Sequence, residues 1–253
     1  MRGVLVTGAS RGIGRAVAHA FAARGDRVAV HYVSSRAGAE ETLAALPGEG
    51  HLLVDGDLGD PTAVQRIAET ADAGLGGVDV LVNNAAVATA ETNAHHPAEA
   101  SYDDWQQVWR RMVDVNLLGA ANLSHCVARR LIARGAPGRI VHIGSRGAFR
   151  GEPDHPAYGA SKAALHALGQ SLAVALAPHG ISVTSVAPGF TATDRVAERL
   201  TGPSGPALRA QSPFGRVGTP EEVAAAVLYL ASPEATWASG TVLDLNGASH
   251  LRL

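Results

Sequence analysis

The sequence predicts a parallel, doubly wound α/β sheet, and two observations support this fold class. Short runs of apolar and β-branched residues recur along the 253-residue chain, and Ala-rich segments with helical periodicity lie between them. A strand that is apolar along its whole length is covered on both faces of its sheet. Strands that alternate with helices are joined by right-handed crossovers and therefore run parallel.

Seven runs have the character of such strands: residues 3–7, 27–33, 51–55, 78–83, 139–145, 181–187 and 241–245. Apolar residues recur every three or four positions from Trp105 to Leu118, which indicates one packed helix over 101–118. The Gly- and Pro-rich stretch 201–207 follows a strand end and is interpreted as a mobile loop near the site. No repeat or long linker is seen, so we expect one domain over 1–253.

The charge and cysteine content exclude several kinds of partner. The formal net charge is -2 and the charged residues are dispersed, so no basic stripe predicts nucleic-acid binding. Cys126 is the only cysteine, which excludes an intrachain disulfide and a multi-cysteine metal site. The first residues enter an apolar strand directly, and no apolar stretch reaches about 18 residues. We expect a cytoplasmic protein with a small-molecule substrate and no membrane or nucleic-acid partner.

A Gly-rich turn follows the first predicted strand. Gly8, Gly12 and Gly14 stand where a backbone turns tightly and approaches a ligand without Cβ atoms. The amides and positive end of the next helix then face a pyrophosphate. Such turns also pack helices on strands without a ligand, but the position after the first strand favours a nucleotide.

Tyr158 and Lys162 lie one helical turn apart and therefore share a face. A phenol titrates near ~10, and a neighbouring ammonium favours the phenolate, so the pair is typical of a general acid or base. Ser145 ends the fifth strand at the edge where doubly wound sheets bind ligands, and its hydroxyl can stabilise charge on a substrate oxygen. A serine hydrolase is excluded, because Ile143 stands where a nucleophile elbow requires glycine.

Four motifs, in this order, resemble the classical short-chain dehydrogenase/reductase family over essentially the whole chain. They are Thr7-Gly8-x3-Gly12-Ile13-Gly14, NNAA at 83–86, Tyr158-x3-Lys162 and Pro188-Gly189. The similarity is greatest to 3-oxoacyl-[acyl-carrier-protein] reductases. It implies a seven-stranded, single-domain Rossmann fold and a nicotinamide cofactor. It also implies hydride transfer between that cofactor and a carbonyl or secondary alcohol, with a substrate lid around 190–215.

The resemblance also implies individual site residues. Asn116 would interrupt a helix and complete a proton path from Lys162 through water, which makes Asn116, Ser145, Tyr158 and Lys162 the catalytic set. Asp57 would lie beside the adenine, with Asp55 as the alternative, and Asn83 with its adjoining backbone beside the ribose. Further cofactor contacts are expected from Ser10, Ile13, Leu58, Asn84, Ala85, Ala86, Tyr158, Lys162, Pro188, Gly189 and Thr191.

The end of the second strand bears on the choice of cofactor. NAD-specific relatives carry an acid there that accepts the ribose hydroxyls, and this chain has Tyr32. Arg11, Arg36 and the hydroxyls of Ser34 and Ser35 can instead donate to a 2′-phosphate. The alternative is that both arginines are ordinary solvated side chains. We expect NADP(H) to be preferred, with NAD as the other option.

Two departures from the family pattern stand out. Ala86 replaces a usual glycine, and the segment 83–116 is longer than in ketoacyl reductases. His95 and His96 within it are adjacent, which is poor geometry for chelating one ion, so they are interpreted as loop histidines and no metal site is predicted.

The substrate is less well specified by the sequence. Arg146, Arg150 and Arg195 can recognise an anion, although loop arginines are more often solvated or paired with acids such as Glu152 and Glu198. The substrate is therefore expected to be a carbonyl compound or alcohol, with a carrier-bound acyl group as one option. The alternatives are an NAD-dependent dehydrogenase of a sugar, steroid or other small alcohol, and a nucleotide-sensing or scaffold protein on the same fold.

Tyr158 and Lys162 are both retained, which favours an enzyme. Small residues on the same helix, together with the resemblance, predict a homotetramer, although burial within one subunit would use the same alanines: Ala163, Ala164, Ala167 and Ser171.

Overall fold

Seven parallel strands form one sheet in the order β3-β2-β1-β4-β5-β6-β7, which confirms the predicted fold class. The computed structural model describes residues 1–252, without the side chains of Arg195 and Glu198. The strand order reverses at β1 and β4, where doubly wound folds open a crevice at the carboxyl ends of the strands. The strands are β1 (Gly3–Val6), β2 (Arg27–Tyr32), β3 (Leu52–Asp55), β4 (Val80–Asn83), β5 (Gly138–Ile143), β6 (Ile181–Pro188) and β7 (Val242–Leu245).

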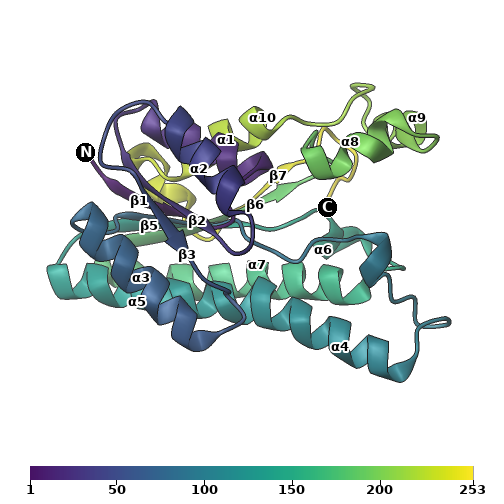
Figure 1. Ribbon diagram of the computed structural model, residues 1–253, viewed down its shortest axis with the longest axis horizontal. Coiled ribbons are helices and arrows are strands. Elements are labelled where there is room, and N and C mark those ends of the chain that lie inside the picture. Colours follow the sequence, from purple (N-terminus) through teal and green to yellow (C-terminus); the bar gives the residue numbers. More distant parts are fainter. Residues whose placement is uncertain (253) are drawn as a thin grey trace.

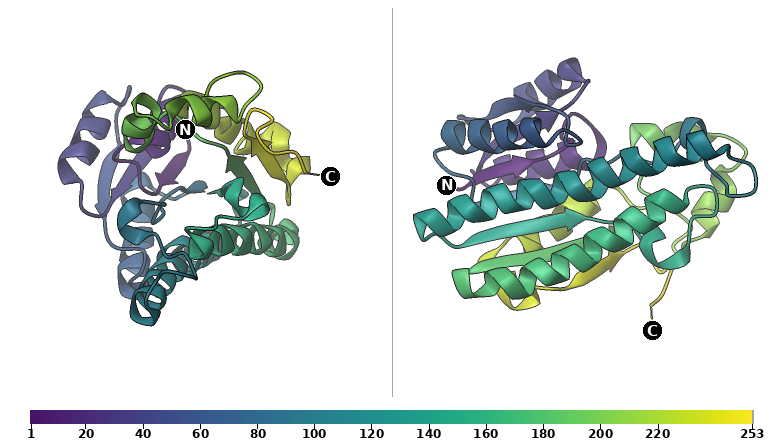
Figure 2. Two further views of the ribbon diagram at one scale, coloured as in Figure 1. Left: turned by 90° about the vertical axis from the view of Figure 1, so that its right-hand side faces the viewer. Right: turned by 90° about the horizontal axis from the view of Figure 1, so that it is seen from below.

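Helices cover both faces of the sheet (Figures 1 and 2). One face carries α1 (Gly12–Ala22), α2 (Arg36–Ala45) and α10 (Pro220–Leu230). The other carries α3 (Pro61–Leu75), α4 (Tyr102–Val113), α5 (Ala120–Arg134) and α7 (Pro156–Leu176). Short 3-10 turns lie at η1 (Glu91–Asn93), η3 (Ala177–His179) and η4 (Pro233–Ala238).

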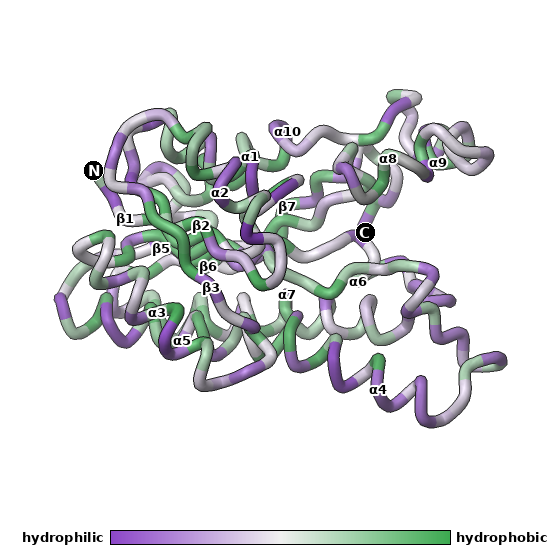
Figure 3. Tube along the Cα trace, viewed as in Figure 1, coloured by the Kyte–Doolittle hydropathy of each residue, from purple (hydrophilic) through white to green (hydrophobic). Residues whose placement is uncertain are grey.

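Alternate residues of a strand serve opposite cores. In β1, Val4 and Val6 pack towards α1 and α10, whereas Leu5 packs towards α3 and α5, and all three are fully buried. This is the period of two that places successive side chains on opposite faces. The strands form the hydrophobic centre of the trace, and hydrophilic segments lie outside it (Figure 3). None of the described helices is long and apolar enough to cross a membrane.

The single helix predicted over 101–118 is wrong in one respect. A π turn, η2 (Asp114–Gly119), separates α4 from α5. Its extra residue shifts the helical register, so Leu118, expected in the apolar stripe, is 47 % exposed, while Asn116 is buried. Gly119 permits close packing here, because a Cβ at this position would lie 2.6 Å from the carbonyl oxygen of Leu58.

The chain between β6 and α10 makes an excursion at the carboxyl edge of the sheet (Figure 1). It contains α8 (Asp194–Thr201) and α9 (Gly205–Ala210), and a bridge between Thr191 and Gly218 closes its base. The stretch 201–207 is therefore partly helical rather than the loop predicted from its Gly and Pro content, and Pro206 stands in the first turn of α9, where a missing N–H is tolerated. A further short helix, α6 (Gly147–Arg150), follows β5.

Candidate active site

The Gly-rich turn between β1 and α1 has the backbone that the spacing predicts. Gly8 and Gly12 have φ values of 64° and 55°, in the left-handed region that favours glycine. Gly14 is required by space, because a Cβ there would lie 2.3 Å from the carbonyl oxygen of Gly8. A Cβ on Gly12 would lie 3.1 Å from Cγ2 of Thr193, so the start of the excursion lies against this turn.

Two side chains of the sequence motifs, Thr7 and Asn84, brace the turn from beneath. Thr7 Oγ1 accepts hydrogen bonds from the backbone N–H groups of Asn84 (2.9 Å) and Ala85 (3.0 Å). The side-chain amide of Asn84 donates to the carbonyl oxygens of Thr7 (2.8 Å) and Gly8 (3.1 Å). The first and fourth strands are therefore fixed to each other where the crevice opens.

His31 braces the same turn from β2. The Gly8 N–H donates to His31 Nδ1 (3.1 Å), and Nε2 lies 2.9 Å from the Gly56 carbonyl oxygen. Burial lowers the pKa of His31 to about 4, so the ring is neutral near pH 7 and one nitrogen is free to accept. The continuous apolar run of β2 would identify His31 as buried, but its partners lie far away in sequence.

The residues predicted near a 2′-phosphate gather at the end of β2. Tyr32 is the last residue of the strand and is buried, while Arg11, Ser34, Ser35 and Arg36 are exposed around it. Arg36 forms an ion pair with Glu40 at 2.8 Å. Arg11 forms no ion pair with any residue of the described part. The geometry thus leaves Arg11 as the freer of the two cations.

At the expected adenine end, Asp57 is already engaged. Its Oδ2 lies 2.9 Å from Arg111 Nη2, and its Oδ1 accepts from the Gly59 N–H at 2.9 Å. Burial alone would raise the pKa of this carboxyl, but the Gly59 N–H and Arg111 outweigh it and hold the pKa below its usual value. The competing candidate Asp55 is exposed and lies 3.6 Å from Arg66.

Two residues expected near the adenosine have buried side chains. The Leu58 side chain packs in the core. Asn83 is also buried, and its amide donates to Ser124 Oγ at 3.0 Å and lies 3.2 Å from His142 Nδ1. Asn83 therefore stabilises the interior with its side chain, and the expectation that it passes beside a ribose applies to backbone alone. The position of Asn83 at the end of an apolar strand did not indicate that its side chain points into the interior.

Lys162 is the most deeply buried of the candidate catalytic residues on α7. Its side chain is inside the protein, and Nζ donates to the Ile143 carbonyl oxygen at 2.8 Å. The same Nζ lies 5.9 Å from the centre of the Tyr158 ring. Burial lowers the pKa of Lys162 to about 8. The predicted shared face of Tyr158 and Lys162 is therefore present.

Asn116 and Ser145 approach the same end of α7 from two other elements. Asn116 Oδ1 accepts from the Val87 N–H (2.8 Å), and its amide donates to Ser161 Oγ (3.1 Å), which ties the π turn to α7. Ser145 follows β5, is half-buried, and accepts from the Gly147 N–H at 3.0 Å. Ser161 Oγ in turn donates to the Tyr158 carbonyl oxygen (2.9 Å). The four predicted catalytic residues thus gather at the carboxyl edge of β5.

His95 lies in the loop after η1, as the sequence predicts, and within that loop it is a buried structural residue. It is buried, its Nε2 accepts from the Ala157 N–H (3.0 Å), and its Nδ1 lies 2.8 Å from the Asn93 carbonyl oxygen. Ala157 is the residue before Tyr158, so the long segment after β4 fixes the start of the helix that carries the phenol. Within the described residues no group of three or more His, Cys, Asp or Glu is placed to hold a metal ion.

The segment after β6 completes the crevice. Thr191 is buried and its hydroxyl donates to the Gly189 carbonyl oxygen at 3.3 Å. A Cβ on Gly189 would lie 3.0 Å from the Asn246 Cα, so this position requires glycine for packing. The tight Gly-rich turn, the strand ends braced by Asn84 and the buried ammonium together fit a dinucleotide laid across the sheet edge.

Comparisons with known proteins agree with this geometry. A family model described as enoyl-(acyl carrier protein) reductase matches residues 8–250. The 3-oxoacyl-[acyl-carrier-protein] reductase of Salmonella typhimurium is 36 % identical over 247 residues, which cover 98 % of this chain and 96 % of the relative. The chain belongs to the short-chain dehydrogenase/reductase family. As a short-chain dehydrogenase/reductase, it is an oxidoreductase of CH–OH groups that binds NAD(P).

Other members of the family at similar identity differ in the substrates that their names give. The 3beta-hydroxysteroid dehydrogenase 1 of Eggerthella lenta is 35 % identical over 251 residues, covering 98 % of this chain and 93 % of the relative. A short-chain dehydrogenase from Burkholderia cenocepacia, solved in complex with NADP, superposes with a TM-score of 0.87 at 34 % identity, covering 98 % and 97 % of the two chains. The family assignment therefore fixes the reaction type and leaves the substrate open.

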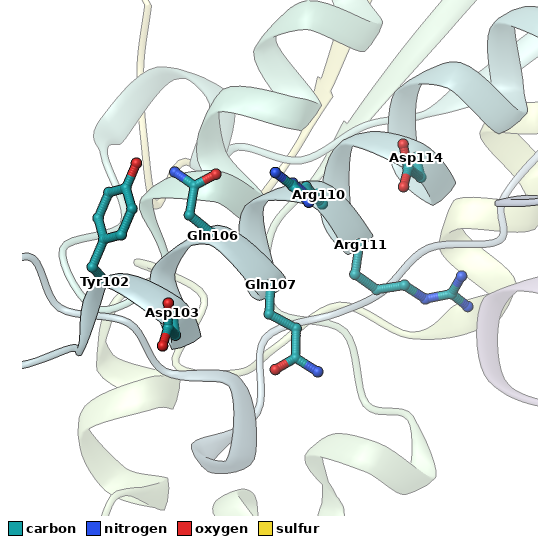
Figure 4. A pocket seen from close by; sticks show the side chains of 7 residues that line it. All are labelled: Tyr102, Asp103, Gln106, Gln107, Arg110, Arg111 and Asp114. Atoms are coloured by element: carbon teal, nitrogen blue, oxygen red, sulfur yellow. The ribbon is translucent and has the colours of Figure 1, made fainter.

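A hollow on the outer face of α4 lies outside the short-chain dehydrogenase/reductase site. It has a volume of about 630 Å³ and is lined by side chains of α4, from Tyr102 to Arg111, and by Asp114 at the start of η2 (Figure 4). Arg111 extends away from Arg110 and reaches Asp57. None of the candidate catalytic residues lines the hollow.

Proposed function

We propose that this enzyme is an NADP(H)-dependent reductase of a ketone or aldehyde, and a dehydrogenase of the matching alcohol, with Tyr158 as general acid and base. The observation that carries the proposal is the buried ammonium of Lys162, held by the Ile143 carbonyl oxygen one helical turn from Tyr158. A buried ammonium without a carboxylate partner destabilises a fold. Its placement beside a phenol supports a catalytic use.

The nicotinamide, when bound, supplies or accepts the hydride at the carbonyl carbon. In reduction, Tyr158 gives its phenolic proton to the carbonyl oxygen, and in oxidation it removes the proton of the alcohol. Ser145 Oγ donates a hydrogen bond to the same oxygen and stabilises the charge that develops there. Lys162 favours the phenolate by its charge, and Asn116 fixes the π turn against α7, beside the route by which the proton is replenished.

The preference for NADP(H) rests on the end of β2. No carboxylate occupies the position of Tyr32, and Arg11 is exposed beside it without an ion-pair partner in the described part. The relative solved with NADP supports the same choice. Gly8, Gly12 and Gly14 would hold the pyrophosphate, and Pro188, Gly189 and Thr191 the nicotinamide end. The relative named L-rhamnose 1-dehydrogenase (NAD(P)(+)), from Sphingomonas, keeps NAD as the alternative.

The relatives' names favour a carbonyl substrate of moderate size. The reductase of Salmonella typhimurium supports an acyl group on a carrier protein, and the steroid dehydrogenase supports a free ketone. We propose that one domain over 1–253 carries both the cofactor site and the substrate site, and that the excursion over 190–215 is the substrate lid. We also propose that the enzyme acts in the cytoplasm.

We also propose a homotetramer, and one face of α7 supports it. Ala167 and Ser171 are exposed on this helix, and Val174 is 80 % exposed, whereas Ala163 and Ala164 are half-buried. Small side chains let a second helix approach closely, and an exposed valine gains from burial there. The native mass from light scattering is expected to be that of four chains, and Ala167→Trp is expected to lower it by overpacking the contact. A monomeric wild-type protein would contradict this assembly.

Tyr158→Phe tests the function directly. The variant is expected to lose turnover at least a hundredfold with a panel of ketones, because the proton donor is absent, while NADPH still binds. Turnover is followed as loss of NADPH absorbance, and cofactor binding as NADPH fluorescence. Wild-type turnover in the variant would show that another group supplies the proton.

A further inference from the structure

A cavity of about 450 Å³ lies beneath the excursion, next to the ends of β5, β6 and β7. Its apolar wall includes Phe190, Leu208, Phe214 and Leu245, and its polar wall includes Arg146 and Gln211. Leu208, Gln211 and Phe214 belong to the predicted lid, so the cavity lies between the lid and the sheet edge.

Arg146 is the unusual residue of this cavity. It is 5 % exposed, and it donates to the side-chain oxygens of Ser249 and Gln211. Its guanidinium carbon lies 4.9 Å from the centre of the Phe190 ring. A guanidinium has five N–H donors, and these two hydrogen bonds leave three of them for a ligand.

The other charged residues that line the cavity take part in ion pairs. Glu222 holds Arg216 with N···O distances of 2.6 and 2.9 Å, and Asp244 pairs with Arg252 at 2.7 Å. No carboxylate of the described residues lies within ion-pair distance of Arg146.

A second cation, Arg150, increases the excess of positive charge around Arg146. Arg150 Nη1 donates to the same Gln211 oxygen at 3.2 Å, and it too has no carboxylate partner in the described part. Glu152, the expected partner of these arginines, forms no ion pair with either. Burial and then the charge of Arg150 lower the pKa of Arg146, and Glu152 only partly opposes this. Two guanidinium groups that share one neutral oxygen favour an anion between or beside them.

We infer that Arg146, supported by Arg150 and Gln211, binds a carboxylate on the substrate, so that the enzyme reduces an oxo acid with an apolar chain. This inference rests on the proposed function and deepens it. Loop arginines are more often solvated, but the burial of Arg146 removes that alternative for it.

The position of Arg146 relative to the reaction centre favours substrate over a separate effector. Ser145 and Arg146 are neighbours, with Cα atoms about 3.8 Å apart. The backbone N–H of Arg146 donates to the Pro188 carbonyl oxygen at 3.0 Å, so Arg146 also touches the strand end predicted to hold the nicotinamide. A chain with its carbonyl at Ser145 therefore has its far end within reach of the cavity, where Leu208 and Phe214 contact its methylene groups.

The test uses linear methyl-ketone acids of increasing length and their methyl esters as matched, uncharged partners. We expect kcat/KM with NADPH to favour the acid over its ester by about tenfold to hundredfold at the optimal length, the range for a charged hydrogen bond. Arg146→Met should reduce this acid-to-ester ratio to near one, because it removes the charge that only the acid contacts. Arg199→Met is the matched control. Arg199 also stacks on the Phe190 ring, but it is exposed and does not line the cavity.

Gln211→Glu provides a second variant that keeps the volume of the side chain. It places a carboxylate beside both arginines, so it should also abolish the preference for acids. A binding measurement accompanies the kinetics: the acid, but not the ester, should raise the melting temperature of the wild-type enzyme with NADP+ bound, and neither should raise that of Gln211→Glu.

The outcomes separate this inference from the proposed function. Equal turnover of acids and esters by the wild type would overturn the inference and leave the reductase intact. An acid preference that survives in both Arg146→Met and Gln211→Glu would also overturn it. Absence of turnover with every carbonyl compound would instead contradict the proposed function, and the melting measurement would still show whether Arg146 binds the acid.

Discussion

The cations inside the crevice and those at its rim differ in what holds them. Lys162 and Arg146 are 3 % and 5 % exposed, and both donate to neutral oxygens, of Ile143 in one case and of Ser249 and Gln211 in the other. At the rim, the Arg36 side chain is 73 % exposed and pairs with Glu40. A buried charge without a counter-charge costs free energy of folding, whereas a solvated one costs little. The interior cations are therefore the ones whose placement requires a functional reason.

Substitution of the most buried cation should give the largest effect. Lys162→Met removes the charge that favours the Tyr158 phenolate, so turnover is expected to fall at least a hundredfold. The same change should stabilise the enzyme without cofactor. The shift of the Lys162 pKa from 10.5 to about 8 corresponds to on the order of 3 kcal/mol of burial cost, offset by about 1 kcal/mol for the lost hydrogen bond to Ile143.

The pH dependence of unfolding tests whether the gain in stability of Lys162→Met comes from removal of the buried charge. Because the folded-state pKa of Lys162 is lowered, the unfolded chain binds more protons between pH about 8 and 10.5. The burial cost is fully present below pH 8 and disappears as the pH rises to 10.5, so the advantage of Lys162→Met in urea unfolding should shrink across this window. Tyr158→Phe is the matched control, since it is expected to lose turnover but keeps the ammonium. A constant difference between Lys162→Met and wild type would assign the gain to packing instead.

The sequence predicts that Tyr158 and Lys162 lie together, but it does not predict the long-range contacts of the other buried polar residues. The reason is physical. Tyr158 and Lys162 are four residues apart, and helix geometry alone places them together. The partners of Arg146 at Gln211 and Ser249 lie 65 and 103 residues away, and no local pattern predicts such contacts. The sequence identified His95 as a loop residue but missed its buried contact for the same reason, because its partner Ala157 is 62 residues away.

The strands and the Gly-rich turn were predictable because their signals are local. Continuous apolar runs gave all seven strands to within about two residues at each end, and glycine spacing gave the turn. The apolar pattern missed the π turn at Asp114–Gly119, which changes the register of a helix without changing its composition. Only the family resemblance, through Asn116, implied an interruption of this helix. Leu118 was therefore placed on the wrong face.

Substitutions at the rim should have smaller, selective effects, and they complete the comparison. Arg11→Ala is expected to weaken NADPH binding about tenfold and NADH binding little. This is the low end for a charged hydrogen bond, because Arg11 is exposed. Arg36→Ala should have a smaller effect, since Arg36 must leave Glu40 to reach a phosphate.

Tyr32→Asp should reverse the cofactor preference, because a carboxylate at the end of β2 repels a 2′-phosphate and accepts the ribose hydroxyls of NADH. Dissociation constants of both cofactors for the wild type and these three variants make the test. A wild-type preference for NADH would mean that the rim arginines do not bind the cofactor. In that case only the interior cations, and not those at the rim, would have a function.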